Sequence, residues 1–137
     1  MHALIGSNAS CHTFTLQLHI GDKIAAALVN SGSDISFINA KFAVKAHCVL
    51  STVPEIQVAK ANGKPMTSQS ACLSCPYIIQ GHTFTTNFRL LEVQGYDIIL
   101  GADWIYKHRP VGLNMQTRQF SITKDGNKLI TFFDESF

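Results

Sequence analysis

The sequence has few charges and no long apolar run. None of its apolar stretches approaches the roughly 20 residues that a membrane-spanning helix needs, and no charged segment precedes an apolar core as in a secretory signal. Charged residues make up 15% of the chain, and its lysines and arginines are scattered, giving a net charge of +2. Because nucleic-acid binding usually needs a basic stripe, we expect no nucleic-acid partner. The short apolar stretches likewise lead us to expect no membrane partner.

Cysteine is also sparse. The chain has four: Cys11, Cys48, Cys72 and Cys75. They could form two disulfide bonds, but nothing else suggests secretion, so we expect reduced thiols and a cytoplasmic location. Cys72 and Cys75 have the spacing of half a zinc or redox site. They lie in a predicted strand, however, where an offset of three puts side chains on opposite faces. Without a second pair at zinc-ligand spacing, we expect no metal and no cofactor.

What the sequence does contain is a succession of short strand patterns. Phe14, Leu16, Leu18 and Ile20 alternate with polar residues, which predicts a strand over 13–20 with these side chains inward. Residues 24–29 are apolar on both faces, as in a strand covered on both sides. Further strands are predicted over 35–38, 56–60, 64–70, 73–79, 83–91, 97–100, 118–123 and 128–133, and short helices over 40–47, after the candidate N-cap Asn39, and over 102–108. Turn signals every 8–12 residues predict one all-β domain, residues 1–137, built as a barrel or sandwich.

The buried strand over 24–29 ends in Asn30-Ser31-Gly32-Ser33. A strand followed by Asp-Ser/Thr-Gly-Ser/Thr is how aspartic proteases present their catalytic carboxylate, and here an amide occupies the carboxylate position. The segment 29–38 resembles the active-site segment of retropepsin-like proteases, in the branch found in gypsy-type LTR retrotransposon polyproteins, especially those of plants. The segment 96–105, with Ile99-Leu100-Gly101 followed by Ala-Asp-Trp, is similar to the second signature of that branch. Residues 58–64 resemble its flap hairpin, and residues 2–6 its lead-in.

This resemblance covers nearly the whole chain in the order of the family. It implies an all-β, retropepsin-like closed barrel with one or two short helices that forms half of a two-fold homodimer. It also implies an aspartic endopeptidase that cuts a peptide or polyprotein substrate. The implied site residues are Asn30, Ser31, Gly32 and Ser33 in the catalytic loop, Ala61, Asn62 and Gly63 in the substrate-binding flap, and Ile99, Leu100 and Gly101 as support for the loop.

Asn30 changes the expected chemistry. Aspartic proteases hold two carboxylates around one water, and the pair shares one proton because both cannot ionise at such close range. An amide cannot act as the general base, and a symmetric dimer with Asn30 would lose both carboxylates. We therefore expect a chain that is inactive or nearly so. The alternatives are a domesticated peptide-binding or dimerisation module on the same fold, and an unrelated β-barrel binding domain.

The remaining polar residues have structural interpretations. Asp34 is expected to cap the loop or face solvent, and Asp97 and Asp103 to bind backbone N–H groups near a strand end and a helix start. Trp104 is expected in the core. The six histidines are dispersed, and no two have i,i+4 spacing, so we expect them at the surface or in hydrogen-bonded positions. Ser31 lacks the His and Asp spacing of a nucleophile-elbow motif.

Overall fold

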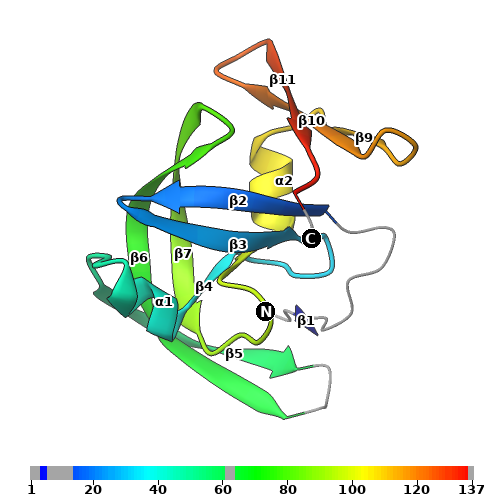
Figure 1. Ribbon diagram of the computed structural model, residues 1–137. Coiled ribbons are helices and arrows are strands. Elements are labelled where there is room, and N and C mark those ends of the chain that lie inside the picture. Colours follow the sequence, from blue (N-terminus) through cyan, green and yellow to red (C-terminus); the bar gives the residue numbers. More distant parts are fainter. Residues whose placement is uncertain (1–3, 6–13, 61–63, 136–137) are drawn as a thin grey trace.

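The computed structural model of the chain describes residues 4–5, 14–60 and 64–135. Most of these residues are in strands, with two one-and-a-half-turn helices (Figure 1). The elements are β1 (Leu4–Ile5), β2 (Phe14–Ile20), β3 (Lys23–Val29), β4 (Phe37–Asn39), α1 (Ala40–Lys45), β5 (Ser51–Lys60), β6 (Pro65–Ile79), β7 (His82–Leu91), β8 (Ile98–Leu100), α2 (Ala102–Lys107), β9 (Gly112–Asn114), β10 (Gln119–Lys124) and β11 (Lys128–Phe133).

Eight of the strands form one sheet that closes on itself. Their order is β1-β5-β6-β2-β3-β8-β4-β7, and an additional pairing of β6 with β7 closes a ring of six strands. Closure removes the unpaired edges that an open sheet would expose. β9, β10 and β11 form a separate three-stranded sheet, drawn in orange and red beyond α2 in Figure 1. The predicted all-β, closed barrel with two short helices is confirmed.

The core follows the predicted alternation. Phe14, Leu16, Leu18 and Ile20 of β2 are all buried, and Trp104 of α2 is 1% exposed. β3 is less completely covered than predicted, because Ile24 at its start is 56% exposed. The second half of β3 is buried between β2, which runs antiparallel to it, and β8, which runs parallel to it. The pairing of β3 with β8 extends from Ala27 to Val29. The two apolar strands predicted over 24–29 and 97–100 therefore lie side by side.

Helix α1 begins where the sequence predicted. The side-chain oxygen of Asn39 accepts hydrogen bonds from the backbone N–H groups of Lys41 and Phe42, at 3.0 and 3.1 Å. These are two of the donors that the first turn of a helix leaves without partners. The helix ends at Lys45, two residues before the predicted end.

Several strand boundaries differ from the predictions. β5 begins at Ser51, five residues before the predicted start at residue 56, and Pro54 lies at a register irregularity between Thr52 and Ile56. β6 is one 15-residue strand where two strands were predicted. β1 and β9 were not predicted, because two or three residues are too few to show a periodic pattern. Among the described residues, no helix is long and apolar enough to cross a membrane.

Candidate active site

The loop after β3 carries Asn30 and is fixed by the neighbouring strand. β3 and β8 run parallel, and the pairing continues past Val29: the Asn30 N–H donates to the Leu100 carbonyl oxygen at 2.9 Å. The chain then turns, and the Ser33 N–H donates back to the Asn30 carbonyl oxygen at 3.2 Å. Asn30 is half-buried, whereas Ser31 and Gly32 are exposed at the tip of the turn. The loop therefore presents position 30 at the surface from a buried strand.

The orientation of the Asn30 amide follows from its partner. The Gly32 N–H donates to the Asn30 side-chain oxygen at 2.9 Å, and only an oxygen can accept there. A Cβ at position 32 would lie 3.1 Å from that oxygen, so glycine fits this close approach. An aspartate could accept the same bond with one carboxylate oxygen. In asparagine an NH₂ group stands in place of the second oxygen. This group can donate hydrogen bonds but cannot take up a proton.

A buried serine that sequence reasoning missed holds the loop to α2. The Ser36 hydroxyl donates to the Asp103 carboxylate at 2.7 Å and accepts from the Gly101 N–H at 2.9 Å. The other Asp103 oxygen accepts from the Ser36 N–H at 3.1 Å. The only sequence signal for this role is one small polar residue within the otherwise apolar run from Ile35 to Ile38.

Gly101 is placed among backbone atoms. A Cβ there would lie 2.5 Å from the Ile35 carbonyl oxygen and 2.7 Å from the Ser33 carbonyl oxygen. This contact lets α2 start directly against the loop, and the Ala102 N–H donates to the Ser33 carbonyl oxygen at 2.7 Å. Ile99 and Leu100 are buried in β8 beneath it. The three predicted support residues thus lie beside the Asn30 loop.

The predicted serines of the loop differ in accessibility. Ser33 is fully buried, and its hydroxyl donates to the Ile35 carbonyl oxygen at 2.7 Å. The Ser31 side chain is exposed. Of these two serines only Ser31 is therefore accessible at the surface, and Ser33 shapes the turn.

The acidic residues near the loop bind backbone groups, as predicted for two of them. An Asp97 carboxylate oxygen accepts from the Ala26 N–H of β3 at 2.9 Å, and Asp103 holds Ser36 as described above. Asp34 is exposed, and its carbonyl oxygen accepts from the Asp103 N–H at 3.3 Å. All three are therefore structural contacts or surface positions, as expected from the sequence.

The predicted flap tip cannot be compared with the structure. Ala61, Asn62 and Gly63 lie outside the described residues. The arms of the hairpin are present as β5 and β6, with Val58 opposite Met66 in the ladder. Their pairing is longer than predicted, since it starts at Ser51 and Ala71.

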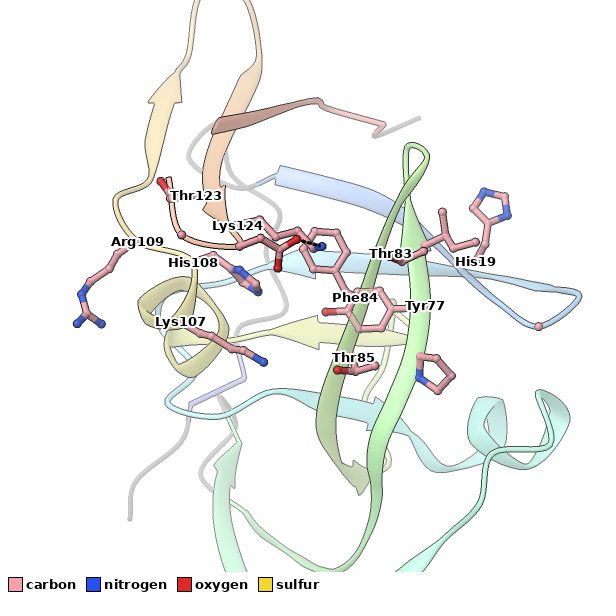
Figure 2. A pocket seen from close by; sticks show the side chains of 15 residues that line it. His19, Tyr77, Thr83, Phe84, Thr85, Lys107, His108, Arg109, Thr123 and Lys124 are labelled. Carbon is pink, nitrogen blue, oxygen red and sulfur yellow. Dashed lines mark hydrogen bonds and ion pairs between the residues drawn. The ribbon is translucent and has the colours of Figure 1, made fainter. Parts of the chain in front are cut away.

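A cavity of about 720 Å³ lies away from the Asn30 loop, and none of residues 30–33 lines it. Figure 2 shows His108, at the end of α2, among Phe84, Lys124 and Thr123. The His108 ring is buried, and its Nε2 atom has no hydrogen-bond partner among the described residues. Burial lowers the pKa of His108, and the positive charge of Lys107 lowers it further. The prediction that the histidines are exposed or hydrogen-bonded is therefore only half met here, because the His108 side chain has a hydrogen bond with the Thr123 backbone but its Nε2 atom has no partner among the described residues.

A second correction concerns cysteine. Cys72 and Cys75 do not point to opposite faces of β6: both are buried in the same core cluster, and Cys48 packs against it. The strand has a register shift between the two cysteines, which breaks the alternation on which the prediction rested. Cys48, Cys72 and Cys75 are free thiols, whereas Cys11 lies outside the described residues.

Comparison with known proteins agrees with this geometry. A family model described as "Retroviral aspartyl protease" matches residues 8–128. Among solved structures, the retroviral protease-like domain of Ddi1 from Leishmania major is similar in fold, with a TM-score of 0.60 and 17% sequence identity. That match covers 88% of this chain and 93% of the other. A search of curated proteins gave no match.

Proposed function

Because the chain belongs to the retroviral aspartyl protease family, we propose that it is the endopeptidase domain of a retrotransposon polyprotein and that Asn30 leaves it inactive or nearly so. The observation that carries the proposal is the position of Asn30. It follows a buried strand, is half-exposed at the surface, and has its side-chain oxygen fixed by the Gly32 N–H at 2.9 Å. This is the place and orientation in which a carboxylate would work.

The proposed loss of activity follows from the atoms of the amide. In the two-carboxylate mechanism, an ionised oxygen removes a proton from the water while the neutral carboxyl polarises the scissile carbonyl. The Asn30 oxygen is already bound to Gly32, and the remaining side-chain atom is an NH₂ group. Without a general base, the rate loses the 10²–10⁴-fold that acid–base catalysis typically supplies.

We propose a homodimer as the functional unit. Each chain contains one copy of the signature, so a complete site needs the loop of a second copy across a two-fold axis. The Asn30 oxygen retains a lone pair that can accept from the amide of the partner subunit. In this arrangement the Asn30 form keeps its dimer while lacking its base, and the flap residues Ala61, Asn62 and Gly63 close over the peptide.

The test is the Asn30→Asp variant, compared with the unchanged chain on a long unstructured polypeptide. We expect the variant to cut with a bell-shaped pH profile on the acidic side of neutrality, at least about 10²-fold faster than the unchanged chain. A pepstatin-like transition-state mimic should block it. Asn127→Asp adds the same charge at an exposed turn and should not cut. Mass spectrometry must exclude spontaneous deamidation at Asn30-Ser31.

The alternative function is a non-catalytic peptide-binding or dimerisation module, which Asn30 itself favours. It is supported if the Asn30→Asp variant forms a dimer in sedimentation experiments yet cuts nothing across the acidic range. A chain that stays monomeric at high concentration would contradict both the dimeric protease and the dimerisation module. Robust cutting by verified Asn30 protein would contradict the proposed loss of activity.

A further inference from the structure

Three cysteines that are far apart in the sequence meet inside the barrel. The sulfur atoms of Cys48, Cys72 and Cys75 all lie within 4.8 Å of one another. Cys72 and Cys75 are 4% and 1% exposed, and Cys48 is half-buried at the edge of the group. We call these three residues the cysteine cluster. It is distinct from the Asn30 loop.

The turn after α1 positions Cys48. His47 has a left-handed backbone, with φ of 57°, and its N–H donates to the Val44 carbonyl oxygen at 3.1 Å. The Cys48 N–H donates to the Ala43 carbonyl oxygen at 3.0 Å. Together these two bonds form a Schellman motif, which ends the helix and turns the next residue back toward it. Cys48 therefore packs against the core instead of continuing into solvent.

A β-bulge in β6 positions Cys72 and Cys75. Cys72 lies opposite Phe88 and Cys75 opposite Thr86, so three steps along β6 match two along β7. The extra residue brings both cysteines to the same face. Ser74 absorbs the irregularity with φ of 51°, and its N–H is held by the Asn87 side-chain oxygen at 2.7 Å.

The cluster consists of soft ligands in a water-poor place. No aspartate, glutamate or histidine among the described residues belongs to it. Burial raises the pKa of Cys75 and of Cys48, and the neighbouring Cys72 raises both further. Burial thus favours the protonated forms of Cys75 and Cys48, and the Cys75 sulfur makes only a weak 3.9 Å contact with the Pro76 carbonyl oxygen. A bound cation would reverse this preference, because coordination deprotonates a thiol.

We propose that Cys48, Cys72 and Cys75 bind one thiophilic cation, Zn²⁺ or Cu⁺, that ties the end of α1 to the bulge of β6. The centre of a triangle with 4.8 Å sides lies about 2.8 Å from each corner, and a zinc–sulfur bond is about 2.3 Å long. Each sulfur therefore needs to move inward by at most about 0.5 Å. Thiolate-only ligand sets select zinc and monovalent copper. Cu⁺ can remain three-coordinate, whereas Zn²⁺ takes a water at the open side beside half-buried Cys48.

The experiment adds Zn²⁺, or Cu⁺ under anaerobic conditions, to the reduced full chain. Stoichiometry and affinity are measured by competition with a colorimetric chelator for each metal. We expect one cation per chain and a melting temperature raised by roughly 5–10 °C at about 100-fold excess over the dissociation constant. Co²⁺ in place of Zn²⁺ should give sulfur-to-metal charge-transfer absorption. The cation with the lower dissociation constant in the competition experiment is the one that the cluster prefers.

The variants separate this site from surface binding. Cys48→Ser changes the half-buried ligand, so the fold should survive, and affinity should fall by more than the roughly 10–100-fold that loss of an outer partner costs. For Cys75→Ser we expect either an equally large loss of cation affinity or a chain that does not fold. His82→Gln removes a half-buried histidine outside the cluster and should bind normally. The proposal is overturned if neither cation binds, if Cys48→Ser binds normally, if His82→Gln abolishes binding, or if untreated protein has a disulfide within the cluster.

Discussion

The two ends of helix α2 lie in different chemical environments. At its first turn, Gly101, Asp103 and Ser36 belong to one connected set of hydrogen bonds with lengths of 2.7–3.1 Å. At its end, the His108 Nε2 atom is buried without a partner among the described residues, beside an open cavity. Trp104 lies between them, with its indole N–H bound to the Tyr77 hydroxyl at 2.8 Å. The first end is fixed by a network of side-chain hydrogen bonds, whereas the second is joined to β10 by a backbone bond from the Thr123 N–H to the His108 carbonyl oxygen at 2.9 Å and leaves one imidazole nitrogen unpaired.

This difference shows how the fold positions the Asn30 loop. An unpaired buried polar atom costs free energy, and of the two ends of α2 only the one distant from the loop has such an atom among the described residues. At the end next to the loop, two carboxylates, Asp97 and Asp103, bind backbone N–H groups of the segments that flank Asn30. The backbone on both sides of Asn30 is therefore held in place by carboxylate hydrogen bonds.

The largest effect should come from Gly101→Ala at the bonded end. The new methyl group would lie 2.5 Å from the Ile35 carbonyl oxygen and 2.7 Å from that of Ser33, and backbone atoms cannot rotate away. We expect a loss of about 3 kcal/mol or more in the free energy of unfolding, comparable to severe overpacking. Urea denaturation measures it. Gly112→Ala is the matched control, because its nearest atom would be the Ser121 Cβ at 4.0 Å. Equal losses in both variants would contradict the close approach at Gly101.

Ser36→Ala should lower the free energy of unfolding by less than Gly101→Ala, although it also acts at the first turn of α2. It removes the donor to Asp103 and the acceptor for the Gly101 N–H, which leaves that buried N–H unpaired. A loss of about 1–3 kcal/mol is expected. Ser121→Ala removes a hydroxyl bonded to Thr131 on the outlying sheet and should cost under about 0.5 kcal/mol. If Ser36→Ala unfolds at the same urea concentration as the unchanged chain, the hydrogen-bonded set is not what holds α2 to the loop.

The bonded end is also where prediction from sequence was most informative. The alternation in β2 and the Asn39 cap are local signals, and the structure confirms both. The order Asn30-Ser31-Gly32 and Ile99-Leu100-Gly101 indicated two loops that the parallel pairing of β3 and β8 brings together. Ser36 gave almost no signal, since one buried serine in an apolar strand resembles an ordinary strand residue.

Features that depend on a break in regularity could not be predicted. The face of Cys75 depends on the extra residue at Ser74, and nothing in the local sequence requires a bulge there. Cys48 meets the other cysteines only because β6 pairs with β7 next to α1, which is a long-range consequence of barrel closure. The burial of His108 likewise arises from Trp104 and from Phe84 on a distant strand, with ring centroids 4.7 and 5.3 Å away.

A smaller effect is expected at the middle of the helix. Tyr77→Phe removes the hydroxyl that accepts from the Trp104 indole and pairs with Thr86 at 2.6 Å. The buried indole N–H would lose its partner, at a cost of about 1–2 kcal/mol. Tyr106→Phe, at a side chain that is 65% exposed, should be nearly neutral and is the control. Thermal unfolding of the two variants compares them directly, and a larger loss for Tyr106→Phe would contradict this account.

The smallest effect belongs to His108 and appears only as a pH dependence. Burial lowers the pKa of His108 below its ordinary value near 6.5, so on acidification the unfolded chain takes up this proton first. The contribution of His108 to stability is complete above pH 6.5 and is lost as the pH falls toward its lowered pKa. His108→Leu should therefore lose less unfolding free energy between about pH 7.5 and 5.0, by at most about 1.4 kcal/mol per pH unit. His19→Leu, at an exposed position of the same cavity, is the control. Parallel pH profiles for His108→Leu and the unchanged chain would show that the two ends of α2 do not differ in this way.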